Sequence, residues 1–139
     1  MATPDKPEDK ELKKLFEDTK TIAVVGLSDK ESRASNRVAA YLKSKGYKIV
    51  PVNPGAEEIL GEKSYPDLKS IPEPVDVVDV FRRPEFVPEV ADAAVEIGAK
   101  VLWLQQGITH EEAAKKARAA GLMVIQDACM YQEHSRLAA

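Results

Sequence analysis

The sequence predicts an α/β protein built on a doubly wound, parallel sheet of five strands flanked by helices. Five short segments rich in Val, Ile and Leu recur along the 139-residue chain, and each is nearly continuously apolar. Strands that are buried on both faces have this composition. Helical patterns lie between most of these segments, and three of the helices end in a glycine shortly before the next strand. This alternation is typical of βαβ units in a Rossmann-like parallel sheet.

The predicted strands span residues 21–26, 48–52, 75–81, 100–104 and 122–126. A first helix is expected ahead of the sheet, over about residues 7–19, and a last helix over residues 129–137. The inner face of the first helix consists of Leu12, Leu15 and Phe16. Residues 1–6 are expected to fray. Because natural domains cluster near ~100–150 residues, we expect residues 1–139 to form a single domain.

The helices between the strands are predicted from apolar residues at helical spacing. Thr109 and Glu112 form a T-x-x-E capping box, which predicts Thr109 as the N-cap of the helix after the fourth strand. Several prolines between the second and third strands leave room only for a short helix near residues 67–70. Glycines that end helices tolerate the left-handed conformation. The predicted inner faces are Ala34, Val38, Tyr41 and Leu42; Phe86, Val87, Val90, Ala93, Ala94 and Ile97; and Ala113, Ala114 and Ala117, and the terminal glycines are Gly46, Gly98 and Gly121.

Composition and charge exclude several classes of function. The formal net charge of −3 and the pI near 5.5 give no electrostatic reason to expect nucleic acid or an anionic membrane as a partner. The longest apolar stretches are far shorter than the ~18–20 residues that a membrane helix requires. The charged N-terminus lacks the apolar core of a signal peptide, and the single cysteine, Cys129, excludes an intramolecular disulfide. We therefore expect a cytoplasmic protein, whose protein partner, if it has one, is unknown.

The turn after the first strand has the features of a phosphate site. Ligands of open parallel sheets bind beyond the carboxyl ends of the strands, where the strand order reverses. A glycine permits a tight turn there, and the following helix offers free N–H groups and a positive dipole end. The segment lacks a G-x-G-x-x-G or a Walker motif, so a simple strand-to-helix turn is the alternative. The candidate residues are Gly26, Leu27, Ser28, Arg33, Ser35 and Asn36.

Asn53 and Pro54 follow the second strand. A dinucleotide-binding domain of the NAD type has Asp or Glu at this place to hold the ribose hydroxyls. A neutral amide followed by a rigid proline lacks that carboxylate. These residues are either walls of a different ligand site or a simple Asn-Pro turn, and both interpretations disfavour NAD.

Two further candidate segments follow the third and fourth strands. Phe81 is placed to cover an adenine or a pantetheine, and Arg82 and Arg83 are placed to meet a phosphate. A solvated or ion-paired arginine pair is the alternative. Gln106 and Gly107 lie in a turn whose amides are expected to donate hydrogen bonds to a ligand.

The sequence shows no convincing catalytic constellation. His110 is expected to cap a polar helix or to be solvated, and Cys129 and His134 are not well superposed on one helical face. Asp79 is able to point toward the ligand end of its strand, but a single acid does not make a mechanism. No cluster of His, Cys or carboxylates has metal-ligand spacing. We therefore expect neither catalytic nor metal-binding residues.

Several widely separated motifs, taken in order, resemble the single-domain CoA-binding protein family. This family is similar to the N-terminal CoA-binding domain of the succinyl-CoA ligase alpha subunit. The resemblance covers residues 20–137, nearly the whole chain. The motifs are IAVVGLS at 22–28, GYKIVPVNP at 46–54, DVVDVFR at 76–82, VLWLQ at 101–105 and DAC at 127–129.

The resemblance implies a Rossmann-like fold that holds coenzyme A across the strand ends. It implies no complete ligase reaction by this chain, because a counterpart of the ligase domain with the phosphorylated histidine is missing. The family pattern reads Asp-Arg-Cys where Ala128 stands between Asp127 and Cys129, so any contact of that arginine is absent. The implied contacts are the diphosphate at Gly26, Ser28 and residues 33–36, walls at Asn53, Pro54, Phe81 and Arg82, and the pantetheine arm near Gln106 and Gly107.

The leading hypothesis is a small, non-catalytic protein that binds or senses coenzyme A or an acyl-CoA. The alternatives are the CoA-binding subunit of a multi-chain acyl-CoA ligase and an NAD(P)-binding Rossmann protein. A further alternative is vestigial ligand binding, for which Ala128 is the only indication. Cys129 is either a small, buried apolar residue or a partner for the pantetheine thiol in a mixed disulfide.

Overall fold

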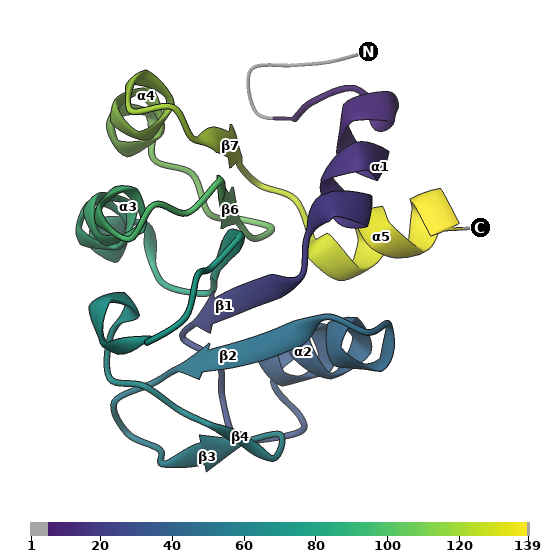
Figure 1. Cartoon of the computed structure of the whole chain (residues 1–139), viewed down its shortest axis with the longest axis vertical. Helices are drawn as coiled ribbons and strands as arrows, with labels where there is room; N and C mark the ends of the chain where they lie inside the picture. Colours follow the sequence, from purple (N-terminus) through teal and green to yellow (C-terminus); the bar gives the residue numbers. More distant parts are fainter. Residues whose placement is uncertain (1–5, 139) are drawn as a thin grey trace.

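The computed structural model describes residues 6–138, which form three layers with one parallel sheet in the middle (Figure 1). The sheet order is β2-β1-β5-β6-β7, and all neighbouring strands are parallel. The predicted five-stranded parallel sheet is confirmed, and every strand lies within its predicted segment. The strands are β1 (Thr21–Val25), β2 (Lys48–Val52), β5 (Val77–Val80), β6 (Val101–Leu104) and β7 (Met123–Ile125).

Helices cover both faces of the sheet, as the doubly wound prediction requires. Helices α3 and α4 pack on one face, and α1, α2 and α5 pack on the other (Figure 1). Two short 3₁₀ helices, η1 and η2, complete the fold, and η1 confirms the short helix predicted near residues 67–70. The bounds are α1 (Asp9–Asp18), α2 (Ala34–Ser44), η1 (Leu68–Ser70), η2 (Pro84–Phe86), α3 (Val87–Glu96), α4 (Glu111–Ala119) and α5 (Met130–Ala138).

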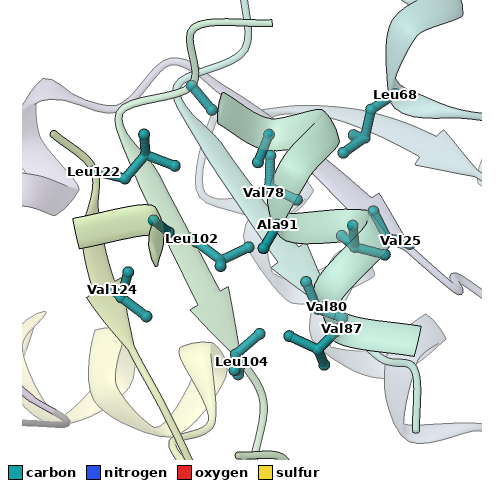
Figure 2. Packing of buried hydrophobic residues seen from close by; sticks show 14 of the residues in the cluster. Val25, Leu68, Val78, Val80, Val87, Ala91, Leu102, Leu104, Leu122 and Val124 are labelled. Carbon is teal, nitrogen blue, oxygen red and sulfur yellow. The ribbon is translucent and has the colours of Figure 1, made fainter. Parts of the chain in front are cut away.

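Each face of the sheet has its own apolar core because successive strand residues point to opposite sides. On the side of α3 and α4, Val78 and Leu102 of the sheet lie beneath Val87 and Ala91 of α3 (Figure 2). On the other side, Trp103 is fully buried, and its indole N–H donates to the Ala128 carbonyl at 2.8 Å. The strands are consequently apolar on both faces, which is the pattern that predicted them.

Two local predictions about helix starts are wrong. The N-cap of α4 is His110, whose Nδ1 accepts the Ala113 N–H at 3.1 Å, and Thr109 lies outside the helix. The His110 main-chain N–H is itself held by the Gln126 side chain at 2.7 Å, which fixes this residue at the cap position. Ala34 was predicted on the inner face of α2 but is exposed at its first position, where Ser35 and Asn36 are buried instead.

A small hairpin, β3 (Glu58–Ile59) with β4 (Glu62–Lys63), occupies the proline-rich link between β2 and β5. Its two turn residues, Leu60 and Gly61, both have positive φ, at 54° and 76°. Such a turn matches the twist of a two-residue hairpin. The chain then runs beside β2, where the Asn53 N–H donates to the Tyr65 carbonyl at 2.9 Å.

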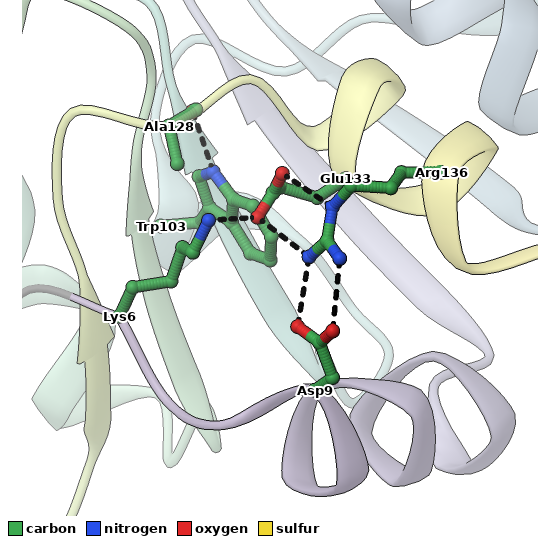
Figure 3. Close-up of polar contacts among 6 residues, drawn as sticks. All are labelled: Lys6, Asp9, Trp103, Ala128, Glu133 and Arg136. Atoms are coloured by element: carbon green, nitrogen blue, oxygen red, sulfur yellow. Dashed lines mark hydrogen bonds and ion pairs between the residues drawn. The ribbon is translucent and has the colours of Figure 1, made fainter. Parts of the chain in front are cut away.

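The two terminal helices are joined by a polar network (Figure 3). Arg136 of α5 donates to both carboxylate oxygens of Asp9 in α1, each at 2.9 Å, and also to Glu133. Lys6 forms an ion pair of 2.5 Å with the buried Glu133. Apart from Lys6, the residues expected to fray lie outside the described part of the chain.

Candidate functional site

The strand order reverses between β1 and β5. The chain passes from β1 through α2 to β2 on one side of β1, and then returns to β5 on the other side. The carboxyl ends of β1 and β5 therefore flank the crevice where such sheets bind ligands. Gly26 follows β1 with φ +86°, and a Cβ at this position would lie 2.5 Å from the Phe81 carbonyl oxygen. The turn after β1 and the end of β5 are thus in direct main-chain contact, which only glycine permits here.

The loop after Gly26 is held in shape by three polar side chains. Asn53 donates from Nδ2 to the Leu27 carbonyl at 2.9 Å, and Asn36 donates from Nδ2 to the Ser28 carbonyl, also at 2.9 Å. Ser35 Oγ accepts the Ser28 N–H at 3.0 Å. These bonds connect the loop to the end of β2 and to the start of α2. Three predicted site residues are therefore brought together, and they shape the loop through hydrogen bonds within the protein.

The start of α2 provides donors that are not used inside the helix. The first N–H groups of a helix have no carbonyl one turn earlier. In α2, the N–H groups of Asn36 and Arg37 donate to the Arg33 carbonyl, so those of Ala34 and Ser35 are the ones left for a ligand. The side chain of Arg33 is exposed beside them. This combination suits an anion.

A cavity of about 270 Å³ opens beside the loop, on the face covered by α3. Among the predicted site residues, Pro54 and Arg82 line it. Val25, Val52 and Val90 give it an apolar wall, and Pro66 and Asp67 lie at its edge. Its volume is near the lower end of the ~300–1,000 Å³ of small-molecule pockets. The sequence analysis missed Pro66, Asp67 and Val90, because Pro66 and Asp67 precede η1, Val90 lies in α3, and no local motif marks them.

The residues after β5 differ in whether they are able to contact a ligand in the cavity. Phe81 is half-buried and packs against the core on the side of α1, α2 and α5. The Arg82 guanidinium lies 4.3 Å from the centre of the Phe86 ring, which orients it. Arg83 points into solvent, with 80% of its side chain exposed, and lies 3.7 Å from Glu85. Arg82 is thus the arginine of this pair that belongs to the cavity.

Gln106 and Gly107 lie after β6, separated from β1 by β5, and both are exposed. The Gly107 N–H donates to Asp127 Oδ1 at 2.7 Å, so this predicted donor already has a partner inside the protein. Asp127 also donates its own N–H to the Ile108 carbonyl at 3.2 Å. The turn is therefore held by the segment that follows β7.

The side chains weighed for catalysis have structural partners or are buried. His134 Nδ1 lies 2.8 Å from the Tyr41 hydroxyl, and burial together with nearby Lys45 lowers the pKa of His134. Cys129 is partly buried against the core. Asp79 is fully buried. Over residues 6–138, no cluster of three or more His, Cys, Asp or Glu side chains is arranged to hold a metal ion. Within the same range, no helix has the length and apolar character needed to span a membrane.

The fold is that of a parallel α/β protein, with a glycine turn and the start of α2 at its switch point. Residues 20–135 match the family described as CoA binding domain, and the chain belongs to that family. An uncharacterised protein of Bacillus subtilis, YneT, is 43% identical over 97% of this chain and 98% of its own length. A structure described as a hypothetical protein from Pyrococcus horikoshii is 40% identical, with a TM-score of 0.96 over 100% of this chain and 98% of that one.

Larger proteins contain a related segment. The ADP-forming acetate–CoA ligase II of Archaeoglobus fulgidus is 34% identical over 70% of this chain, which spans only 15% of the length of that ligase. The sequence predicted membership of the single-domain CoA-binding family and a similarity to the succinyl-CoA ligase alpha subunit. The family is confirmed, and the ligase relative found is an ADP-forming acetate–CoA ligase.

Proposed function

We propose that this protein binds coenzyme A or an acyl-CoA across the carboxyl ends of β1, β2 and β5, as a binding or sensing protein without catalysis of its own. The observation that carries the proposal is the loop after Gly26. Its carbonyls are engaged by Asn53 and Asn36, while the N–H groups at the start of α2 lie beside it. A carbonyl that already accepts a hydrogen bond is less available to repel an anion, so the loop favours a diphosphate.

The cavity beside the loop supports a site for the base of the nucleotide. Its wall of Val25, Val52 and Val90 suits a planar, apolar ring face, and Arg82 provides charge for a phosphate. From the diphosphate at α2, an extended pantetheine arm would run toward the ends of β6 and β7. Gly107 would then contact the arm only if its N–H exchanged Asp127 for the ligand.

The same contacts disfavour an NAD site. The Asn53 side chain uses its Nδ2 on Leu27 and its Oδ1 on the Gly55 N–H, at 2.8 Å. An NAD site needs an acceptor at this position that is free to bind the ribose hydroxyls. Asn53 lacks the negative charge, and its oxygen already accepts one hydrogen bond.

A second function, as the CoA-binding subunit of a multi-chain acyl-CoA ligase, is favoured by the similarity to acetate–CoA ligases. In that case a partner chain would bring the acyl-transfer residues. Purification of the tagged protein from its native host would show a stoichiometric ligase partner if this second function is correct. Recovery of the protein alone would favour the independent binding protein.

Isothermal titration with CoA, dephospho-CoA and NAD tests the proposal directly. We expect CoA to bind and NAD to give no measurable heat of binding. Weaker binding of dephospho-CoA would show that the 3′-phosphate is recognised. Binding of NAD in preference to CoA, or no binding of CoA at millimolar concentration, would overturn the proposal.

A further inference from the structure

Asp79 lies at the centre of the sheet and has no polar partner. It is paired in register with Val24 of β1 and Trp103 of β6, and its exposed fraction is 0%. Neither carboxyl oxygen accepts or donates a hydrogen bond to any described residue. An ionised carboxylate without a partner is very costly in an apolar interior. Burial accordingly raises the pKa of Asp79 well above its ordinary range.

The elements packed over this side of the sheet bring almost no charge toward Asp79. Helix α1 turns Leu12, Leu15 and Phe16 inward, and α2 turns Val38, Ala39 and Leu42 inward. From α5, Met130 and Glu133 are buried, and Glu133 is already paired with Lys6 and Arg136. The other titratable groups at the rim of this core are Tyr41, Tyr47, His134 and Cys129, and each of the two tyrosines contacts His134. Nothing in this layer compensates a negative charge on Asp79.

Asp79 also lies directly beneath the proposed ligand site. It precedes Phe81 by two residues on the same face of the sheet, and its partner Val24 precedes Gly26 by two residues. At ~3.3 Å per strand residue, the main chain of Asp79 is about 7 Å from that of Phe81, which contacts Gly26. The space between them is protein interior, where charges are poorly screened. A ligand diphosphate at the loop therefore acts on the charge state of Asp79.

We propose that Asp79 is a proton-binding residue coupled to the ligand site, so that an anionic ligand binds more tightly when Asp79 is neutral. The ligand part of this inference rests on the proposed function. Because coupling between two bound species is reciprocal, the ligand also stabilises the proton on Asp79. Ionisation of Asp79 would place a negative charge beneath the diphosphate and weaken its binding.

The coupling is tested by the pH dependence of CoA affinity in the wild type and in Asp79→Asn, which is nearly isosteric and cannot ionise. We expect the wild type to lose about tenfold in affinity from mildly acidic to alkaline pH relative to Asp79→Asn. This is the size expected for two unit charges roughly 12 Å apart at an effective dielectric constant of about 20, with the diphosphate lying beyond the contact between Gly26 and Phe81. The phosphate of the ligand titrates equally in both proteins, so the comparison isolates Asp79. Asp76→Asn, at the opposite end of β5, is the matched control and should retain the wild-type profile.

Infrared difference spectroscopy provides a readout that needs no ligand. The wild type should show the C=O band of a protonated carboxyl group at neutral pH, and Asp79→Asn or Asp79→Val should lack it. Identical pH profiles of CoA affinity in wild type and Asp79→Asn, or no such band, would overturn the coupling alone. If CoA does not bind at any pH while the band is present, the proposed function and the coupling are both overturned. The band would still show that the Asp79 carboxyl group is protonated.

Discussion

The side-chain amide of Asn53 donates to the main-chain carbonyl of Leu27 at 2.9 Å, which joins the end of β2 to the turn after β1. The Asn53 oxygen accepts the Gly55 N–H at 2.8 Å, so both polar atoms of this amide are used within the protein. Asn53 therefore contributes to the candidate site by fixing the shape of the loop.

Replacement of Asn53 by Ala should loosen the loop and weaken CoA binding. Two hydrogen bonds are lost, and a typical buried or half-buried bond contributes about 0.5–1.5 kcal/mol. We expect the free energy of unfolding to fall by about 1–3 kcal/mol, measured by urea denaturation, and the CoA affinity to fall with it. Asn53→Asp is the matched variant, because it keeps an acceptor for Gly55 but has no donor for Leu27. Unchanged binding in both variants would contradict the role assigned to this bond.

Gly26→Ala should be much more destabilising than the same change at Gly121. Both glycines have positive φ, at 86° and 99°, so both substitutions strain the main chain by about 1–2 kcal/mol. Only at Gly26 would the added Cβ meet another atom closely, the Phe81 oxygen at 2.5 Å, and such overpacking costs a further ~1–3 kcal/mol. Thermal melting of the two variants measures the difference. Equal melting temperatures would show that β1 and β5 separate easily at this point.

Arg82→Ala should reduce CoA affinity far more than Arg83→Ala. Arg82 lines the cavity and is oriented by Phe86, whereas Arg83 is exposed. A charge-assisted contact with a phosphate contributes about 1.5–3 kcal/mol, which is roughly 10- to 150-fold in affinity. Titration calorimetry at two salt concentrations checks this, with a smaller salt dependence expected for Arg82→Ala. Equal losses in the two variants would remove Arg82 from the proposed phosphate contacts.

The stability of the fold should decrease as the pH falls from neutral toward 5. Burial lowers the pKa of His134, so the unfolded chain takes up a proton at a higher pH than the folded protein does. Stability from this group is fully present above the ordinary histidine pKa of about 6.5 and is lost as the pH falls through the lowered value. Urea denaturation of wild type and His134→Gln at several pH values measures it, since glutamine keeps an acceptor for Tyr41 but does not titrate.

Lowered carboxyl pKa values produce a separate loss of stability in more acidic solution. The pKa of Asp76 is lowered despite partial burial, because its carboxylate accepts the Thr21 and Lys20 N–H groups and faces Lys100. The pKa of Glu133 is lowered by Lys6 and Arg136. The stability that these carboxylates contribute is fully present above the ordinary carboxyl pKa values and is lost as the pH falls through the lowered values. His134→Gln should leave this loss of stability in acidic solution unchanged. If His134→Gln loses as much stability as the wild type between neutral pH and pH 5, His134 is ruled out as the titrating group.

The sheet was predictable because the apolar patterns that indicate its strands and helices lie within short segments of the sequence. Segments such as Thr21–Val25 and Val101–Leu104 are buried on both faces and are therefore apolar throughout, and the helices between them show one apolar stripe each. The hairpin of β3 and β4 was not predictable in this way. Its strands have two residues each and are mostly polar, and Leu60 adopts a left-handed conformation that its sequence does not indicate.

The location of the candidate site was predictable from the sequence, but the hydrogen bonds of its side chains were not. Strand ends and a glycine turn mark where sheets of this kind bind ligands, so the sequence indicated Gly26, Ser28, Asn53 and Arg82 as candidates. The structure has these residues at the strand ends, and their contact with a ligand stays a prediction. Whether a polar side chain faces the ligand or the protein depends on neighbours that are distant in the chain. Asn53 reaches Leu27 across 26 residues and Gly107 reaches Asp127 across 20, and no local pattern contains such pairs.

The sequence by itself determined the succession of strands and helices and the position of the crevice at the strand ends, since periodicity and turn residues act over a few neighbouring positions. Only the tertiary structure decided the fate of the polar groups. In the folded protein, the Asn36 and Asn53 side chains hold the loop through hydrogen bonds, His110 caps α4, and Asp79 is buried without a hydrogen-bond partner. The physical reason is that the hydrogen bonding and desolvation of a polar group depend on everything packed around it.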